Sequence, residues 1–302
     1  MSDQALDLVF NAARQAHDNG VRLRASSAAL ARLATTAGSK TEEPLAPARA
    51  EAPALAKTPP FSNTLPSTRS EISTPQSSTL APARDPQTPK VDGSKAERLA
   101  ALRGPVLACT LCPHLVKSRT QVVFGVGNPE AELMFVGEAP GADEDTVGEP
   151  FVGRAGQLLT RIIEAMNFKR ADVYIGNVLK CRPDVPPGES GNRKPTHEEM
   201  EVCKPYLLQQ IEIIQPKVLV ALGATAVEGL LGIEKAGITR MRGNWKEFHG
   251  IPLMPTFHPS FLLRPSSEQL ANKRLVWEDM MQVLERLGHA ITEKQRGYFQ
   301  KS

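Results

Sequence analysis

Residues 133–141 read LMFVGEAPG, an apolar run of five residues followed by an acid, a proline and a glycine. A short continuous apolar run that ends in a turn is typical of a strand buried on both faces. Glycines and carboxylates continue after it to Gly156, in GEAPGADEDTVGEPFVGRAG. This loop contains no lysine, so it does not match a phosphate-binding loop.

Three further apolar runs resemble the first, and together they predict four strands, at 132–136, 173–178, 217–222 and 253–257. Longer amphipathic segments between them predict helices at 96–107, 155–166, 196–214, 224–231 and 267–287. Alternating strands and helices are typical of an α/β protein. We therefore expect a three-layer α/β/α sandwich around a central, mainly parallel four-stranded sheet.

Three polar clusters leave the carboxyl ends of predicted strands, in the stretches LMFVGEAPG, YIGNVLKC and LMPTFHPS. In open α/β sheets, ligands bind outside those ends. We therefore expect the three clusters to converge on one rim of the sheet and to form the functional site there.

The first third of the chain has a different composition. Residues 41–90 hold ten of the 25 prolines, with many serines, threonines and alanines. Such a stretch buries too little apolar surface to offset its ordering entropy, which predicts a disordered linker over 39–93. Residues 1–38 show helical apolar spacing, and the sequence leaves open whether this appendage docks on a partner protein or on nothing. The catalytic domain is expected at 94–290, with a C-terminal tail at 291–302.

Composition excludes some function classes and permits others. The net charge is +3 and the pI is about 8.7, which permits a nucleic-acid partner without arguing for one. No stretch approaches the roughly 20 apolar residues of a membrane helix. The first residues, MSDQALDLVF, lack the pattern of a signal peptide. We expect a cytoplasmic monomer with no membrane association.

Four cysteines form a C-x-x-C pair at Cys109 and Cys112, with Cys181 and Cys203 far downstream. The second pair is too widely spaced for an ordinary zinc knuckle. Irregular spacing suits an iron–sulfur cluster when the fold supplies the geometry. The spacing alone leaves zinc, a cluster, or a surface redox pair with two buried thiols as alternatives.

The glycine-rich loop has two simpler interpretations. A dinucleotide fingerprint fails because Gly125 and Gly127 precede the strand and the G-x-G-x-x-G spacing is absent. An ordinary strand-to-helix turn with solvated acids is the commoner alternative. Against it, Phe151 lies in a glycine-rich surface loop without an obvious core role, where an aromatic ring could stack on a planar ligand.

Five motifs in order, together with the four cysteines, resemble the family-4 uracil-DNA glycosylases, the iron–sulfur branch of that superfamily. The motifs are GEAPGADED, GEPFVGRAGQLL, NVLKCRP, NRKPT and TFHPSFLLR. The resemblance covers residues 100–287 and leaves the N-terminal third unexplained. One departure is visible, because the segment between Cys181 and Cys203 is several residues longer than the family leads us to expect.

The resemblance implies a DNA repair glycosylase that hydrolyses the N-glycosidic bond of uracil and leaves an abasic site. It also implies a [4Fe–4S] cluster on Cys109, Cys112, Cys181 and Cys203. Breaking this bond builds positive charge on the sugar and negative charge on the base, which a carboxylate and a hydrogen-bond donor would stabilise.

The resemblance also implies roles for individual residues. Glu144 is the carboxylate that positions water and faces the sugar, and His258 donates to uracil O2 as neutral imidazole. Asn177 pairs with O4 and N3–H of uracil, where cytosine presents the reverse pattern. Phe151 stacks on the base, and the substrate-binding residues include Gly137 and Glu138. Taken alone, a lone histidine is more often structural, and an asparagine after a strand is commonly a cap.

The target base must leave the duplex before it can be cleaved. The stretch HPSFLLRP offers a set of DNA-contacting residues beside the rim: Ser260, Leu262, Leu263 and Arg264. We expect either Leu262 or Leu263 to wedge into the gap left by the base, and Arg264 to meet a phosphate. The simpler alternative is that two of the three apolar residues at 261–263 are core residues that start the last helix.

Two other functions remain as alternatives. One is a non-catalytic iron–sulfur DNA-binding module, against which the presence of Glu144, Asn177 and His258 argues. The other is a relative that bonds covalently to the abasic sugar through a histidine in a basic loop, for which His197 is the candidate. The motif NRKPT matches the ordinary family pattern and argues against this second alternative.

Overall fold

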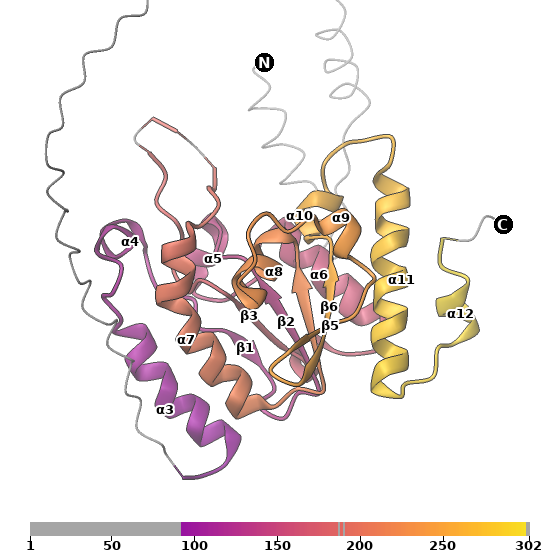
Figure 1. Cartoon of the computed structure of the whole chain (residues 1–302), viewed down its shortest axis with the longest axis horizontal. Coiled ribbons are helices and arrows are strands. Elements are labelled where there is room, and N and C mark those ends of the chain that lie inside the picture. The colour runs from indigo at the N-terminus through magenta and orange to yellow at the C-terminus, as the bar shows by residue number, and fades with distance from the viewer. Residues whose placement is uncertain (1–91, 187, 190, 300–302) are drawn as a thin grey trace, which may run out of the picture. The chain divides into compact units, whose positions relative to one another are not determined.

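The computed structural model describes residues 92–186, 188–189 and 191–299. The predicted helical appendage at 1–38 and all but the last two residues of the predicted linker at 39–93 lie outside this part. The described residues form helices on both sides of one sheet (Figure 1). No helix in these residues is long and apolar enough to cross a membrane.

Four parallel strands form the centre of the sheet in the order β3-β2-β4-β6. They span Leu133–Gly137 (β2), Tyr174–Asn177 (β3), Val218–Leu222 (β4) and Ile251–Thr256 (β6). All four match the strands predicted from sequence. Because Gly137 is paired with Asn177, the loops after β2 and β3 leave the sheet side by side.

Two short antiparallel strands extend the sheet to six, where the sequence predicted four. Val126–Gly127 (β1) pairs with β3 at one edge, and Lys246–Phe248 (β5) pairs with β6 at the other. Strand β1 has two residues and the first two residues of β5 are exposed. Neither has the buried apolar run by which the central strands were predicted.

Alternate residues of each strand enter different halves of the core, which produces the three layers. Met134 and Val136 pack with α3 (Lys95–Leu107), α7 (His197–Ile214) and α8 (Ala224–Leu231). Leu133 and Phe135 pack with α6 (Arg154–Ala165) and α11 (Gln269–Leu287) on the opposite face. The predicted α/β/α sandwich is confirmed, with each predicted helix ending within two residues of its expected bounds.

Side-chain caps define where two of these helices begin. Ser94 caps α3 in a reciprocal pair with Glu97, and Thr196 caps α7 in a reciprocal pair with Glu199. Such capping boxes satisfy backbone donors that the first turn leaves without partners. The start of α7 therefore fixes the end of the long loop after Cys181.

Short helices surround the rim and the chain end. They are α4 (Pro113–Ser118), α5 (Ala142–Val147), the 3₁₀ turn Arg170–Asp172, α9 (Ile238–Met241), α10 (Pro259–Leu262) and α12 (Glu293–Arg296). The segment expected as a C-terminal tail includes α12, which packs on the domain. There Gln295 is buried, and its carbonyl accepts a 2.9 Å hydrogen bond from Trp277 Nε1.

A buried carboxylate anchors the end of β6, from which the His258 loop departs. Asp279 of α11 accepts a 2.6 Å hydrogen bond from Thr256 Oγ1 and pairs with Arg242. Removal from water raises the pKa of Asp279, and the arginine and threonine oppose this. The network ties α11, the end of β6 and the segment after α9 together beneath the site.

Candidate active site

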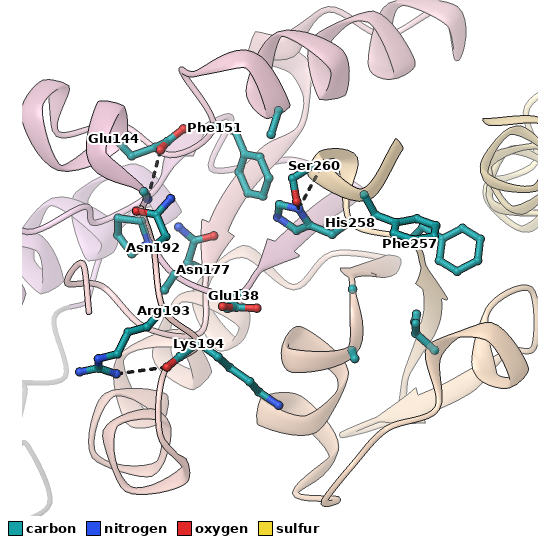
Figure 2. A pocket seen from close by; sticks show the side chains of 18 of the residues that line it. Glu138, Glu144, Phe151, Asn177, Asn192, Arg193, Lys194, Phe257, His258 and Ser260 are labelled. Carbon is teal, nitrogen blue, oxygen red and sulfur yellow. Dashed lines mark hydrogen bonds between the residues drawn. The ribbon is translucent and has the colours of Figure 1, made fainter. Parts of the chain in front are cut away.

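A cavity of about 640 Å³ opens at the carboxyl ends of β2, β3 and β6, beside the start of α8 (Figure 2). Residues from all three predicted polar clusters line it, among them Glu138, Asn177 and His258. Glu144, Phe151 and Arg264 line it as well. The predicted convergence on one rim is therefore what the structure shows.

Asn177 forms the innermost polar corner of this cavity. Its side chain is 2% exposed, and Oδ1 is the one buried side-chain nitrogen or oxygen in the described residues that has no hydrogen-bond partner. Leaving a buried acceptor without a donor costs about 1–3 kcal/mol. A buried acceptor that faces a cavity and lacks a donor indicates a ligand that supplies an N–H or O–H group.

Gly137 makes this corner possible because it has no side chain. A Cβ built on Gly137 would lie 2.4 Å from Asn177 Oδ1 and 2.5 Å from Phe151 Cζ. Both distances are far inside van der Waals contact. The glycine therefore lets the amide of Asn177 and the ring of Phe151 approach the same point, as expected for a slot that holds a flat ligand.

Phe151 combines a core position with a cavity-facing edge. It is 7% exposed, packs among the core residues on the α6 and α11 side, and has a left-handed φ of +55°. A Cβ on Gly156 at the start of α6 would lie 1.8 Å from the Phe151 carbonyl oxygen. The first turn of α6 thus holds the Phe151 backbone closely, and its ring lies 5.6 Å from that of His258 between centroids.

His258 caps α10 with one ring nitrogen and leaves the other available to the cavity. Nδ1 accepts from the Ser260 backbone N–H at 3.1 Å and lies 2.8 Å from Ser260 Oγ. A backbone N–H only donates, so Nδ1 carries no proton and Nε2–H is the donor of the neutral ring. Burial, aided by Arg264, lowers the pKa of His258 to about 4.

Glu144 lies on the opposite rim, in α5. Its Oε1 accepts from the backbone N–H groups of Val152 and Gly153 at 3.0 and 3.1 Å, and Oε2 accepts from Gly141 at 3.1 Å. The carboxylate therefore ties both ends of the glycine-rich loop together. It brings negative charge to the cavity and is also a structural part of the loop.

Two further carboxylates, Asp145 and Glu138, lie in different environments. Asp145 is buried and accepts from the backbone N–H of Thr120 at 2.9 and 3.0 Å, so it ties α5 to the segment after α4. Glu138 faces the cavity, where burial raises its pKa against a hydrogen bond with Thr225 and the nearby charge of Lys194. Glu138 thus places a second carboxyl group near the slot.

Asn192 is a cavity residue to which the sequence assigned no role. A Cβ built on Gly141 would lie 3.1 Å from Asn192 Nδ2 and 2.7 Å from Glu144 Oε2, so the amide and the carboxylate both lie beside this glycine. Arg182 Nε donates to Asn192 Oδ1 at 3.3 Å. It belongs to the long loop after Cys181, and the sequence did not predict where this loop lies in the fold. The motif NRKPT was the available signal.

The same loop is fastened by Arg193, which pairs with Asp184 and with the buried Glu199. Glu199 also lies 2.7 Å from His114 Nε2, and these contacts bring its pKa to about 2 despite burial. Lys194 reaches the cavity and pairs with Glu228. His197, the candidate for covalent attachment, is exposed and is absent from the cavity wall.

The four predicted DNA-contacting residues have different environments. Ser260 and Arg264 are exposed and line the cavity, whereas Leu263 is half-buried and lines a separate hollow next to Leu158 and Trp277. Leu262 is 1% exposed and packs in the core against α6 and α11 residues. Of the two leucines expected as the wedge, Leu262 is held in the core, which leaves Leu263 as the candidate.

The four cysteines gather where the α3–α4 segment, the end of β3 and α7 meet. Cys181 and Cys203 are buried, Cys109 and Cys112 are half-buried, and all four join one core cluster. Burial and, to a smaller extent, the neighbouring cysteines raise the pKa of Cys112 to about 11 and that of Cys203 to about 12. Thiols this close need a positive centre to ionise together.

The distances between the cysteine sulfur atoms can be compared with those of a zinc site. A tetrahedral zinc site places its thiolates about 2.3 Å from the metal and so about 3.8 Å from one another. Among the described residues, no three cysteine sulfurs lie within 4.8 Å of one another. The one group of three potential metal ligands that close together is His114, Asp184 and Glu199, and Arg193 donates hydrogen bonds to Glu199 there. The described cysteine sulfurs are thus not arranged as in a tetrahedral zinc site.

Positive groups already face these sulfur atoms. Arg119 donates to Cys181 Sγ at 3.0 Å and to the Cys109 carbonyl oxygen, and the backbone N–H of Lys180 donates to Cys203 Sγ at 3.2 Å. Hydrogen bonds to the sulfurs and nearby cations are features that stabilise thiolate-bound iron–sulfur clusters. The donor set thus fits such a cluster.

Comparison with known proteins gives the same family as the motifs. The family description "Uracil DNA glycosylase superfamily" matches residues 124–281, which is more than half of the chain. The chain belongs to the uracil-DNA glycosylase superfamily. It is 48% identical over 189 residues to the type-4 uracil-DNA glycosylase of Thermotoga maritima, covering 62% of this chain and 93% of that protein.

Other relatives place the chain within that superfamily. It is 44% identical over 165 residues to the type-4 uracil-DNA glycosylase of Archaeoglobus fulgidus, covering 52% of this chain and 79% of the relative. A type-5 uracil-DNA glycosylase of Thermus thermophilus is 30% identical over 155 residues, which cover 41% of this chain and 68% of the relative. The higher identity and coverage place the chain in the type-4 branch of the uracil-DNA glycosylases.

Proposed function

We propose that this protein removes uracil from DNA by hydrolysing the N-glycosidic bond, leaving free uracil and an abasic site. The observation that carries this proposal is the unpaired, buried Asn177 Oδ1 facing a flat slot beside Phe151. Uracil N3–H would supply the missing donor, and the amide N–H₂ of Asn177 would donate to O4. Cytosine has an acceptor at N3 and a donor at position 4, so it would clash with both groups.

Departure of the base is assisted by His258. Its Nδ1 is committed to the Ser260 N–H, so Nε2–H is the hydrogen that the ring offers to uracil O2. Negative charge grows on O2 only as the bond breaks, and a fixed donor then stabilises the transition state more than the bound substrate. The low pKa of His258 keeps the ring neutral at physiological pH.

The sugar side of the site contains Glu144 and Asn192. Positive charge develops on the sugar as the base leaves, and the Glu144 carboxylate supplies a compensating negative charge. Water is held between this carboxylate and the Asn192 amide, which both lie beside Gly141. A carboxylate already fixed by three backbone N–H groups needs no reorganisation during the reaction.

DNA is held on the rim around the cavity. Arg264 is the exposed cation nearest to His258 in sequence and lines the cavity, in a position to meet a phosphate. Leu263 is the remaining candidate for the wedge. Phe261, which is 38% exposed and packs on Phe257, provides a further apolar surface there.

The cysteines Cys109, Cys112, Cys181 and Cys203 would hold a [4Fe–4S] cluster. When bound, the cluster would cross-link the α3–α4 segment, the end of β3 and α7, and the hydrolysis itself would need no electron transfer. Purified protein is therefore expected to be brown and to contain iron and acid-labile sulfide in equal amounts. Stoichiometric zinc without iron or sulfide, in protein prepared anaerobically, would contradict the cluster.

The experiment that tests the function uses a 5′-labelled oligonucleotide with one uracil, followed by alkali to cut abasic sites. The expected result is strand cleavage at the uracil position, free uracil in solution, and no protein–DNA band that resists denaturant. A denaturant-resistant band without free uracil would favour covalent trapping of the sugar. Binding with neither product would favour a non-catalytic DNA-binding module.

A further inference from the structure

Lys180 is a buried lysine in the segment that joins the base-recognition residue to the cysteine site. It is 1% exposed and lies between Asn177, which ends β3, and Cys181. Among the residues that the structure describes, no carboxylate lies within ion-pair distance of its ammonium group. A buried ammonium is costly unless its hydrogens have partners, so its contacts need an explanation.

The ammonium group is held by two neutral acceptors. Nζ donates to the Asn177 carbonyl oxygen at 2.9 Å and to Gln210 Oε1 at 2.5 Å. The other end of the Gln210 amide donates to the Phe124 carbonyl oxygen at 2.9 Å and to the Tyr174 hydroxyl at 3.1 Å. Lys180 thereby fixes the main chain of Asn177 to α7 through a fully buried glutamine.

The backbone of Lys180 contacts the cysteine site. Its N–H donates to Cys203 Sγ at 3.2 Å. Cys203 and Gln210 are seven residues apart on α7, which places them two turns apart on one face. One residue thus contacts a cysteine through its main chain and the base-recognition residue through its side chain.

We propose that Lys180 is a positioning residue that couples the cysteine-bound cluster to the placement of Asn177, and through it to uracil binding. The proposal rests on the function and the cluster proposed above. The cluster fixes Cys203 and the Lys180 backbone, and the ammonium group fixes the Asn177 carbonyl. Arg119 also contacts the cysteines but none of its hydrogen bonds reaches Asn177, so it belongs to the cluster site alone.

The test compares Lys180→Met, which keeps the length of the side chain and removes its donors, with wild type. Two quantities are measured: iron retained during incubation with a chelator, and inhibition of uracil excision by free uracil in samples of equal iron content. Lys180→Met is expected to lose iron faster and to need about tenfold more free uracil for half-inhibition, because a charge-assisted hydrogen bond is lost.

Two further variants separate coupling from a general loss of structure. Arg119→Met is expected to lose iron faster while its iron-loaded fraction keeps the wild-type response to free uracil. Lys217→Met removes an exposed lysine that pairs with Glu132, and is expected to match wild type in both measurements. Folding of each variant is followed by far-ultraviolet circular dichroism.

Removal of the cluster from wild type provides a measurement that needs no substitution. Uracil should bind cluster-free wild type about as weakly as it binds Lys180→Met, and cluster removal from Lys180→Met should weaken binding little further. If Lys180→Met does not fold, Gln210→Met replaces it. This variant removes the Gln210 acceptor of Lys180 Nζ and should show a smaller loss of iron retention and a smaller loss of uracil affinity.

The coupling is refuted if these variants keep the wild-type response to free uracil, or if they lose uracil affinity while iron retention is unchanged. It is also refuted if cluster removal from wild type leaves uracil affinity unchanged. These outcomes differ from failure of the proposed function, in which wild type neither excises uracil nor is affected by it.

Discussion

At the scale of single residues, the cavity brings together one buried acceptor without a donor and one ring nitrogen with no recorded partner among the described residues. Asn177 Oδ1 has no hydrogen-bond donor, and Nε2–H is the donor of the His258 ring because its other nitrogen caps α10. Neither property follows from residue type alone. Both arise because β3 and the His258 loop place these side chains at one cavity.

The pH dependence of excision tests the state of His258. Its pKa in the folded protein is about 4, below the ordinary value of 6.5, so the neutral ring persists where a free histidine would become charged. Single-turnover excision should be constant from about pH 8 to about pH 5.5 and should fall only as the pH approaches 4. The stability that the neutral ring contributes is complete above pH 6.5 and is lost as the pH falls toward 4. A midpoint near 6.5 that disappears in His258→Ala would contradict this assignment.

Gly137→Ala tests the close approach of Phe151 and Asn177. The added methyl group would lie 2.4 Å from Asn177 Oδ1 and 2.5 Å from Phe151 Cζ, so both side chains must move. We predict at least a tenfold loss of kcat/KM for uracil excision. Gly104→Ala in α3 is the matched control, because nothing lies within 4 Å of its Cβ, and it should leave activity unchanged. Equal activity of the two variants would argue against the slot.

At the scale of elements, Glu144 links α5 to the loop that precedes α6. Glu144→Ala should therefore destabilise the fold as well as slow catalysis, because three backbone N–H groups lose a charged acceptor. We expect a loss of about 2 kcal/mol or more, or roughly 4–8 °C in Tm. Glu149→Ala removes an exposed carboxylate from the same loop and should change Tm little. A Tm of Glu144→Ala equal to wild type, with excision lost, would assign Glu144 to chemistry alone.

The elements show where sequence reasoning succeeds and where it does not. The four central strands and five long helices follow from apolar periodicity, since each must be buried on a defined face. Strands β1 and β5 were not predicted, because edge strands of two and three residues have little periodicity. The stretch HPSFLLRP was expected to present its apolar residues to DNA, but α10 within it buries Leu262 in the core.

Some features of the site could be predicted from the sequence, and others could not. Position after a strand was enough to predict that Asn177, Glu138 and His258 converge. The capping of Nδ1 by Ser260, the backbone bonds of Glu144 and the cavity position of Asn192 depend on how loops fold back in three dimensions. The network of Lys180 joins residues 30 positions apart in sequence, which no local pattern reveals.

At the scale of the whole molecule, all site residues and cysteines belong to the part from Asp92 onward. Deletion of residues 1–91 should leave excision and cooperative unfolding intact, since Ser94 and its capping box are retained. Thermal unfolding and the oligonucleotide assay on the shortened and full chains check this. Loss of cooperative unfolding in the shortened chain would show that residues 1–91 are needed for the fold of the domain.

In the proposed reaction, the buried Asn177 acceptor recognises uracil through its N3–H group. The most direct test of this recognition replaces uracil with N3-methyluracil at the same position of a single-stranded oligonucleotide and compares single-turnover release of the two bases. The substrate alone changes, so protein folding cannot account for a difference. We predict that uracil is released and that N3-methyluracil is released at least about a hundredfold more slowly, because the methyl group leaves Asn177 Oδ1 without a donor. Release of both bases at equal rates would show that Asn177 does not recognise uracil through N3–H.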